Sequence, residues 1–448
     1  MALDTAGAGG SPEPTAPADP TTWGARHAHD PTVVRADDGT YVMFSTDALA
    51  GGVPPAGAHV RTSRDLVTWT WAGTALDGVP AAAHAWSGAP GLWAPEVVRW
   101  DETTWHMYYS ASTFGSNTSA IGLATAPDPR GPWTTGPLVV RTRTGEQTQN
   151  AIDAAVVREP DGTPWLVYGS FFSGIYALRL DPATGLAVDD GDLGTCVARR
   201  NRSVEGAVEG AYVVRRDGDS NTGGGPRYWM FLSYDSLFNA YHVRVGLAEH
   251  PAGPYLDRDG RDLTDIDSPP HRVGTSILEG HALPGEPPWI APGHASVLRL
   301  AASEGPDGVA LDPDGVDLLV HHVREADDAH QHHAQLRRLV WTASGWPAVA
   351  PLPYRGEDLV SGRPTGPDPR LAGTWDVLDL RLAAEAGPTG PIRRAAAWTS
   401  ADGDLRAFGD VVVVPGRDAD GRDVLTFTGY TVDRAGVSGV LRGGDREV

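Results

Sequence analysis

The stretch His29-Asp30-Pro31-Thr32-Val33-Val34 opens a pattern that returns along the chain. In each copy a polar or acidic residue precedes an apolar triplet, an Asp/Gly-type turn follows, and an aromatic run ends in Ser or Thr. The first copy has its turn at Asp37-Asp38-Gly39 and its aromatic run at residues 41–46. Further copies start near residues 94, 153, 209 and 294. Short apolar runs separated by turn residues, with almost no helical periodicity, predict an all-β chain.

Five copies at a spacing of about 60 residues, or about 85 where a long loop intervenes, predict a five-bladed β-propeller with four-stranded blades. The innermost strand of each blade begins at the same end of the central channel, so the residues that open the copies are expected to ring one mouth. These residues are Asp30, Trp93, Asp153, Glu209 and His294. Three of the five are acidic, which predicts that carboxylates distant in sequence converge on one site.

The composition of the chain predicts four segments. Residues 1–22 form an Ala/Gly/Pro-rich, acidic leader expected to be disordered, and residues 23–352 form the propeller. A Gly/Pro/Asp-rich linker covers residues 353–369. Residues 370–448 are expected to form a small C-terminal β-barrel or β-sandwich domain.

Charge and hydropathy narrow the class of ligand. The 448 residues carry a formal net charge of −21, so nucleic acid is excluded as a partner. No run approaches the roughly 20 apolar residues of a membrane helix, so no membrane partner is expected. A single cysteine, Cys196, cannot form an intrachain disulfide. A neutral ligand fits best, and the 15 tryptophans offer aromatic faces for sugar rings.

An ordered set of motifs in this chain resembles glycoside hydrolase family 43, and within that family the endo-α-1,5-L-arabinanases. The motifs are His29-Asp30-Pro31, Leu92-Trp93-Ala94-Pro95-Glu96-Val97, residues 108–124, Asn150-Ala151-Ile152-Asp153, residues 168–176, Glu209-Gly210-Ala211-Tyr212 and Ala291-Pro292-Gly293-His294. The chain departs from the family pattern at Ala154, where proline is usual, and at Ala295, where asparagine is common. Gly373-Thr374-Trp375 and Phe427-Thr428-Gly429 resemble the small β domain appended to some extracellular arabinanases.

The resemblance implies how the carboxyl groups divide the chemistry. Hydrolysis with inversion uses a base that activates water and an acid that protonates the leaving oxygen. By resemblance, Asp30 is the general base and Glu209 the general acid. Asp153 orients Glu209 and raises its pKa by like-charge proximity. Glu205, in the near-duplicate Val204-Glu205-Gly206-Ala207, is a rival for the acid, but Glu209 is favoured because an apolar strand follows it.

The same resemblance implies the residues that contact sugar and ion. The expected substrate-binding residues are His29, Trp93, Phe114, Gly115, Asn150, Ser170 and Phe171. Trp93 and Phe114 have core packing as their alternative. His294 is expected to hold a calcium-like, mostly water-coordinated ion, with a hydrogen bond to a carboxylate as the alternative. The cluster His330-Gln331-His332-His333 is interpreted as a solvated loop rather than a zinc site.

The expected function is therefore cleavage of internal α-1,5-arabinofuranosyl linkages in plant cell-wall arabinan or arabino-oligosaccharides. The resemblance implies an extracellular monomer, although residues 1–20 lack the features of a signal peptide, which leaves a cytoplasmic enzyme as the alternative. An exo-acting α-L-arabinofuranosidase or β-xylosidase of the same family is the first alternative function. A non-catalytic sugar-binding propeller is the second, and it would not need three carboxylates. The match over residues 114–119 favours endo action.

Overall fold

The computed structural model describes residues 19–217, 225–360, 365–381 and 392–442. Most of the predicted leader and part of the predicted linker lie outside these residues. The described part is mostly β-strand, with one α-helix, α1 (Ala81–Ser87). Short 3-10 turns cover Pro20–Thr22, Arg202–Val204, Pro270–Arg272, Pro369–Leu371 and Arg406–Phe408. No helix in this part of the chain has the length and apolar character needed to span a bilayer.

Four sheets each contain four antiparallel strands in sequence order. The first holds β1 (Thr32–Arg35), β2 (Tyr41–Ser45), β3 (His59–Ser63) and β4 (Thr70–Thr74). The second holds β5 (Trp93–Arg99), β6 (Trp105–Ala111), β7 (Ser119–Ala126) and β8 (Thr134–Thr142). The third holds β9 (Ala155–Arg158), β10 (Pro164–Tyr168), β11 (Ile175–Arg179) and β12 (Thr195–Ala198). The fourth holds β13 (Val208–Arg216), β14 (Arg227–Tyr234), β15 (His242–Ala248) and β16 (Thr275–Leu278).

Two further sheets complete the described part of the chain. The fifth has the order β21-β20-β19-β18-β17-β23. Its strands are β17 (His281–Ala282), β18 (Trp289–Leu300), β19 (Val316–Glu325), β20 (His332–Trp341), β21 (Pro347–Val349) and β23 (Arg393–Arg394). The sixth has the order β24-β22-β27-β26-β25. Its strands are β22 (Gly373–Asp379), β24 (Ala396–Ser400), β25 (Asp410–Arg417), β26 (Asp423–Tyr430) and β27 (Gly436–Leu441).

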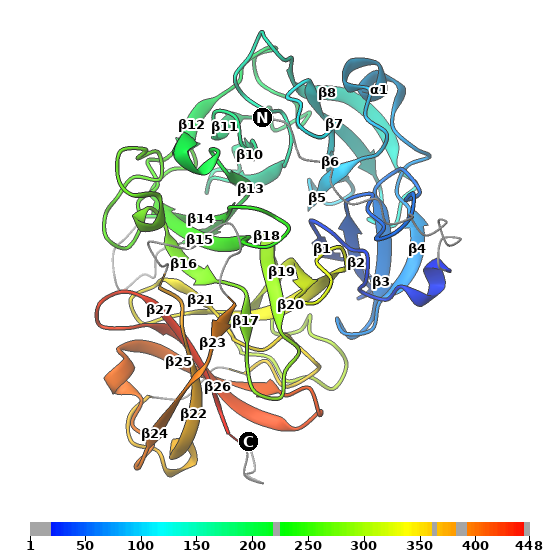
Figure 1. The fold of residues 1–448 in the computed structure, drawn as a ribbon. Helices are drawn as coiled ribbons and strands as arrows, with labels where there is room; N and C mark the ends of the chain where they lie inside the picture. Colours follow the sequence, from blue (N-terminus) through cyan, green and yellow to red (C-terminus); the bar gives the residue numbers. More distant parts are fainter. Residues whose placement is uncertain (1–18, 218–224, 361–364, 382–391, 443–448) are drawn as a thin grey trace, which may run out of the picture.

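The first five sheets follow one another around a common centre (Figure 1). Their inner strands touch in succession: β1 contacts β5, β5 contacts β9, β9 contacts β13, β13 contacts β18, and β18 contacts β1. The N-terminal segment adds a closing contact, because the amide of His27 donates to the carbonyl of His332 at 2.9 Å. The two ends of this ring of sheets therefore meet.

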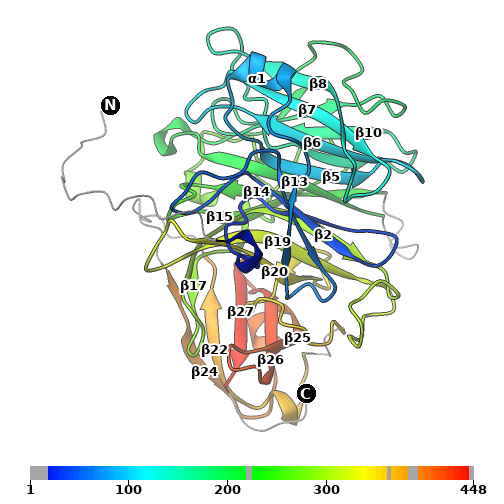
Figure 2. The same ribbon diagram turned by 90° about the vertical axis from the view of Figure 1, so that its right-hand side faces the viewer.

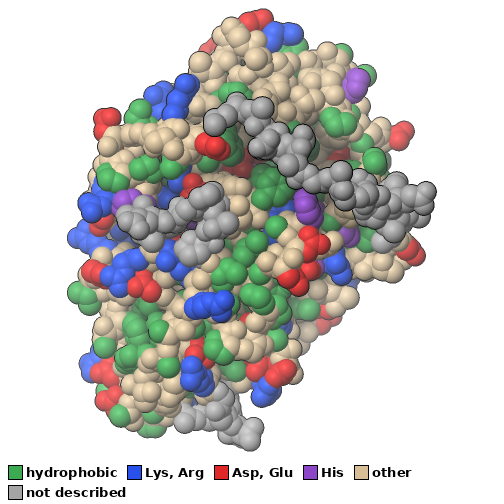
Figure 3. Space-filling view, in the orientation of Figure 1, with side chains coloured by type: hydrophobic (Ala, Val, Ile, Leu, Met, Phe, Trp, Pro, Cys, Tyr) green, Lys and Arg blue, Asp and Glu red, His purple; other side chains and the backbone are tan. Residues whose placement is uncertain are grey.

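The second strands of the first two sheets are buried on both faces. All residues of β2 and of β6 are buried, because each strand is sandwiched between neighbouring sheets. This explains why the sequence shows continuous apolar and aromatic runs there instead of strict alternation. On the face shown in Figure 3, the described acidic and basic side chains are interspersed.

The sixth sheet packs against one side of the ring (Figures 1 and 2). Tyr430 of β26 donates its hydroxyl to the carbonyl of Pro347 at 2.5 Å, and Thr428 donates to the carbonyl of Val349 at 2.7 Å. Strand β23, which lies within the predicted C-terminal domain, pairs in parallel with β17 of the fifth sheet. The C-terminal segment is thus joined to the ring both by packing and by strand pairing.

Candidate active site

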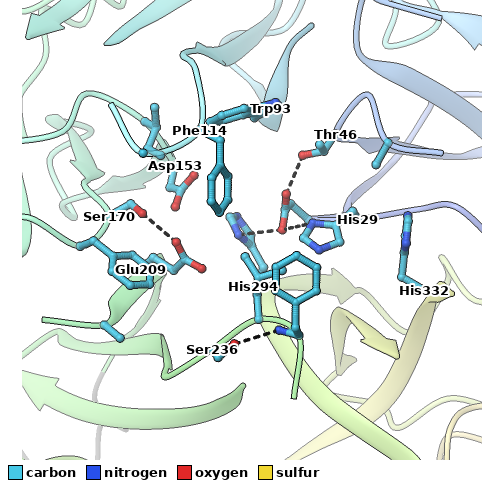
Figure 4. Close-up of a pocket in the computed structure, with 18 of the residues that line it drawn as sticks. His29, Thr46, Trp93, Phe114, Asp153, Ser170, Glu209, Ser236, His294 and His332 are labelled. Atoms are coloured by element: carbon cyan, nitrogen blue, oxygen red, sulfur yellow. Dashed lines mark hydrogen bonds and ion pairs between the residues drawn. The ribbon is translucent and has the colours of Figure 1, made fainter. Parts of the chain in front are cut away.

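A cleft of about 1040 Å³ opens where the five sheets meet. Every sheet of the ring contributes to its lining. The lining includes the five residues expected to ring one mouth: Asp30, Trp93, Asp153, Glu209 and His294. In Figure 4, Asp153 and Glu209 lie on one side, His29 and Thr46 lie on the other, and His294 lies between them.

A residue with a left-handed backbone conformation lies shortly before or within the inner strand of every sheet in the ring. The φ angles are positive at Asp30, Ala94, Asp153, Gly210 and His294. Trp93 and Glu209 therefore lie one residue before the equivalent position, which corrects the predicted equivalence of the five openings. Because the side-chain direction changes from one residue to the next in an extended chain, Glu209 corresponds in register to His29 and not to Asp30.

The amide at each turn is held by a side chain. In three of the five turns, that side chain is a hydroxyl at the end of the second strand of the preceding sheet. Ala94 donates to Thr46 Oγ1 at 2.8 Å, Asp153 to Ser110 Oγ at 2.9 Å, and His294 to Ser233 Oγ at 2.7 Å. The predicted Ser/Thr ending of the aromatic run thus has a structural cause.

The remaining two turns replace this contact. The amide of Asp30 donates to Nδ1 of His322, which takes the place of the hydroxyl, at 3.2 Å. The amide of Gly210 donates to Oδ2 of Asp153 at 3.3 Å, and Ser170, the equivalent hydroxyl, turns to Glu209 instead. These two substitutions occur beside the three acidic side chains.

Asp30 is held in its ionised form. Its side chain has an exposed fraction of 12%, and its carboxylate accepts from His29 Nδ1 at 2.8 Å, from His294 Nδ1 at 3.1 Å and from Thr46 Oγ1 at 2.6 Å. Burial alone would raise the pKa of Asp30, but electrostatic interactions and hydrogen bonds with His29 and His294 hold that pKa well below its usual value. A carboxylate kept ionised in this way can accept a proton from water.

Glu209 and Asp153 have the opposite character. Burial raises the pKa of Glu209, although the Ser170 hydroxyl opposes this shift by donating to Oε2 at 2.7 Å. Burial also raises the pKa of Asp153 to about 8, and the negative charges of Glu209 and Asp30 add to the shift. These two carboxyls therefore retain protons at a pH where Asp30 has lost its own.

His294 forms the hydrogen bond that was the alternative to metal binding. Although burial lowers its pKa, the charge and hydrogen bond of Asp30 raise the pKa of His294 to about 9, and Asp153 and Glu209 contribute. The imidazole is thus a positive centre among three acidic groups.

The predicted sugar-binding residues all line the cleft. Phe114 projects from the loop after β6 with an exposed fraction of 84%, so it is not a core residue. It is followed by Gly115 with φ +79°. Trp93, the first residue of β5, is half-buried. Its cleft-lining position distinguishes it from the fully buried aromatic residues of β6.

Asn150 and Phe171 shape the wall next to Glu209. Buried Asn150 accepts from Ser119 Oγ at 2.7 Å and donates to the carbonyl of Ser170 at 3.3 Å. Phe171 has φ +50° and donates its amide to the carbonyl of Val208 at 2.9 Å. These contacts fix the loop after β10 and place the Ser170 hydroxyl on Glu209. Their effect on substrate is therefore partly through Ser170.

Glu205 lies at the edge of the same cleft, where it ends a short 3-10 turn in a left-handed conformation. It is exposed, whereas Glu209 is half-buried and bonded to Ser170. Burial raises the pKa of Glu209, and this environment favours Glu209 as the acid.

The interpretation of residues 330–333 as a solvated loop is wrong for its second half. His332 and His333 begin β20, because the turn after β19 is short. His332 is buried, with its ring 5.2 Å from that of His29, and His333 pairs with Glu325 at 2.5 Å. His330 and His332 both line the cleft.

Among the described residues, the one group with metal-like spacing is His29, Asp30 and His322. Nδ1 of both histidines is already engaged by Asp30, whereas Nε2 of His322 has no hydrogen-bond partner among the described residues. His29 Nδ1 contacts Asp30 Oδ1, and His322 Nδ1 accepts from the Asp30 amide. This arrangement fits a hydrogen-bonded support for Asp30 better than a metal centre.

Four residues at the site were not predicted individually: Thr46, Tyr241, His322 and Arg324. The repeated Ser/Thr ending of the aromatic runs was a usable signal for Thr46. Tyr241 opposes the raised pKa of Glu209 through a hydrogen bond, and its ring stacks on His322 at 5.6 Å. No local pattern marks Tyr241, His322 or Arg324, because their partners lie in other sheets.

An ionised carboxylate opposite carboxyls of raised pKa is the combination that glycoside hydrolases use. The family model of glycosyl hydrolases family 43 matches residues 24–347. The chain belongs to this family.

Three similar proteins carry arabinan-related names. An extracellular endo-α-(1→5)-L-arabinanase of Bacillus subtilis is 30% identical over 345 residues, covering 74% of this chain and 91% of its own. One of Thermotoga petrophila is 28% identical over 370 residues, covering 74% and 72%. An extracellular exo-α-(1→5)-L-arabinofuranosidase of Cellvibrio japonicus is 28% identical over 342 residues, covering 72% and 86%.

Solved structures agree with this likeness. The endo-1,5-α-L-arabinanase of Thermotoga petrophila has a TM-score of 0.71 at 23% identity, covering 95% of this chain and all of its own, and shows a shared fold. The α-L-arabinanase of Cellvibrio cellulosa complexed with arabinohexaose has a TM-score of 0.58 at 27% identity, covering 72% and 95%.

Proposed function

We propose that this chain is an endo-α-1,5-L-arabinanase that cleaves internal linkages of arabinan with inversion of configuration. The observation that carries the proposal is that two carboxyls with contrasting partners line one cleft: Asp30 pairs with His29 and His294, and Glu209 is bonded to Ser170. These surroundings lower the pKa of Asp30, whereas burial raises that of Glu209. An inverting glycosidase needs this combination of a base and an acid. The relatives named as endo-acting arabinanases supply the sugar and the linkage.

Asp30 acts as the general base. A carboxylate offers about four lone-pair positions. His29 and His294 use two at Oδ1, and Thr46 uses one at Oδ2. The position that remains on Oδ2 accepts a hydrogen bond from the attacking water and then its proton.

Glu209 acts as the general acid. Because the Ser170 hydroxyl donates to Oε2, the carboxyl proton belongs on Oε1, from which it passes to the leaving oxygen. Asp153 accepts the amide of Gly210, the residue after Glu209, and so orients the strand that carries the acid. An ionised Asp153 would also favour the protonated state of Glu209 by like-charge proximity.

The architecture we infer is a five-bladed β-propeller over residues 23–352, followed by a linker at 353–369 and a C-terminal β domain at 370–448. Support comes from five sheets of at least four strands each and from the ring of contacts between their inner strands. The separate sheet of β22 and β24–β27 supports the C-terminal domain. The pairing of β23 with β17 ties this domain to the fifth blade.

Calcium is the proposed ion, and His294 is the proposed protein ligand. Calcium prefers oxygen donors, so an ion beside one imidazole keeps most of its waters. Among the described residues, Oε1 of buried Glu96 is one of the buried acceptors without a hydrogen-bond partner, and Glu96 interacts electrostatically with His294. His294 and, through water, Glu96 would hold the ion, which would supply positive charge among the carboxylates.

Chelator treatment tests the ion. We expect lower activity or a lower Tm after removal of calcium, with recovery when calcium is restored. Because an ion must displace the proton of His294, the recovery of activity when calcium is restored is expected to be smaller at acidic pH. Full activity and an unchanged Tm after exhaustive chelation would leave His294 as a hydrogen-bonding residue only.

We propose that the enzyme is a monomer that acts outside the cell. The location is supported by the relatives named above, which are called extracellular. Its polymeric substrate supports this location. The net charge of −21 suits a neutral polysaccharide and opposes nucleic acid.

Comparing viscosity with monosaccharide release tests endo action. Linear arabinan should lose viscosity well before arabinose accumulates, because internal cleavage shortens chains from the middle. The anomer formed first should be the inverted one, measured by proton NMR. Early arabinose as the main product would establish the exo-acting alternative, for which the Cellvibrio japonicus relative is a precedent. Preference for xylan or xylo-oligosaccharides would establish a β-xylosidase.

A further inference from the structure

Arg324 is the next-to-last residue of β19 and links the general base to the rim of the cleft. It is 4% exposed and lines the cleft. We propose that Arg324 is a positioning residue that holds His29 in the Nδ1–H tautomer, so that His29 donates to Asp30. This inference rests on the proposed role of Asp30 as the base.

The tautomer follows from the donor inventory. A guanidinium donates hydrogen bonds and accepts none. Because an Arg324 terminal nitrogen lies 2.9 Å from His29 Nε2, that ring nitrogen must be the acceptor. The proton of a neutral His29 then sits on Nδ1, which lies 2.8 Å from Asp30 Oδ1. The opposite tautomer would set two donors against each other at Nε2 and two acceptors at Nδ1.

Arg324 is itself fixed by contacts from two other loops. Its Nε donates to the carbonyl of Leu237 at 2.6 Å, and a terminal nitrogen donates to the carbonyl of Ala329 at 2.5 Å. Its guanidinium also lies 4.7 Å from the centre of the Phe238 ring. With these partners the guanidinium of Arg324 has little freedom, and its third hydrogen bond is directed at His29 Nε2.

The His29 ring is also held in its plane. It stacks on His322 with centres 3.8 Å apart and an interplanar angle of 24°. Stacking sets the plane of the ring but not which nitrogen is protonated. The acceptor Asp30 at Nδ1 and the donor Arg324 at Nε2 together specify the protonated nitrogen, and Arg324 also makes His29 Nε2 unavailable to a metal ion.

Arg244 provides a matched control. It is 2% exposed and donates from Nε to His242 Nε2 at 2.9 Å and from a terminal nitrogen to the carbonyls of Pro270 and Val273. Its guanidinium lies 4.4 Å from the Tyr234 ring centre. Arg244 thus makes the same types of contact on the fourth sheet. Its partner His242, unlike His29, does not donate to Asp30.

The first test reads the tautomer directly. In full-length protein labelled with ¹⁵N-histidine, the His29 signals are assigned by comparison with His29→Gln. We expect a protonated Nδ1 and an unprotonated Nε2, and loss of this pattern in Arg324→Met. Protonated Nε2 in the unmodified enzyme would overturn the proposal. This readout does not depend on the substrate, so it decides the inference even if arabinan is not hydrolysed.

The second test measures kcat on linear arabinan. Arg324→Met should lower kcat by about 10- to 100-fold, the scale expected for a small displacement of a catalytic group. Arg324→Lys, which keeps one donor, should recover part of the loss. Arg244→Met should lower the Tm to a similar extent and leave kcat within about twofold of the unmodified enzyme.

A double variant separates positioning from general loss of structure. If Arg324 acts through His29, then His29→Ala with Arg324→Met should be no slower than His29→Ala alone. Multiplicative losses in the double variant would contradict the proposal. If Arg324→Met does not fold, the same cycle with Arg324→Lys decides the question.

Discussion

Thr46 and Ser170 end equivalent strands, yet each gives its hydroxyl proton to a different carboxyl. Thr46 donates to Asp30 and Ser170 donates to Glu209, at 2.6 and 2.7 Å. At Asp30 two histidines add to this effect, and the ionised form prevails. At Glu209 burial dominates, and the protonated form is favoured. Two similar contacts therefore accompany opposite chemical roles, and the neighbouring charges decide between them.

Removing the Ser170 hydroxyl should shift the pH dependence of activity. The working form has Asp30 ionised and Glu209 protonated, so activity falls as the pH rises through the pKa of Glu209. A hydrogen bond to the carboxylate lowers that pKa, so Ser170→Ala should raise it. We expect the alkaline limb of the kcat profile to move to higher pH.

Ser173→Ala is the control for this shift, because Ser173 lies in the same loop and donates to the carbonyl of Thr148 instead. Its alkaline limb should match that of the unmodified enzyme. An alkaline limb that stays in place, or moves to lower pH, in Ser170→Ala would remove Glu209 from the role of acid.

The loops that follow the second strands form the rim of the cleft. Phe114 comes from the loop after β6, Phe172 from the loop after β10, and Phe238 from the loop after β14. All three are among the exposed large hydrophobic residues, with exposed fractions of 84%, 41% and 43%. Exposed apolar groups gathered around one cleft are typical of a binding surface. The strands position the acid and base, whereas these loops determine how a chain of sugars is held.

Phe114→Ala should weaken the binding of long substrates more than it slows the chemistry. Loss of an aromatic contact is expected to raise KM for linear arabinan by about threefold to tenfold, with kcat little changed. Val432→Ala, at an 83% exposed position of the sixth sheet's β26–β27 turn region, is the control and should leave both constants unchanged. A lower kcat at constant KM would mean that Phe114 acts in the chemical step.

At the scale of the strands, the sequence predicted where the strands lie better than which residues occupy equivalent positions in them. The copies near 30, 94, 153, 209 and 294 correspond to the five sheets, because turn residues and aromatic runs are local signals. The one-residue offset of Trp93 and Glu209 was missed, since it depends on which residue takes the left-handed turn. The contact between His29 and Arg324 spans 295 positions and leaves no local signature.

At the scale of the whole molecule, the closed ring of sheets is what makes a site possible. Asp30, Glu209 and His294 come from the first, fourth and fifth sheets, and no two of them belong to one strand. The contact of β18 with β1 brings His294 to Asp30. The sixth sheet packs on the outside of this ring, and the described residues that line the cleft all precede it in the chain. The chemistry therefore depends on the ring as a unit.

The most direct test is the rate of linear arabinan hydrolysis, measured as reducing ends released, by the unmodified enzyme, Asp30→Asn and Glu209→Gln. Both changes keep the size of the side chain and remove its ability to accept or deliver the proton. With circular dichroism confirming the fold, each variant should lose about 10²- to 10⁴-fold in kcat. Near-normal hydrolysis by either correctly folded variant would contradict the assignment of Asp30 as base and Glu209 as acid.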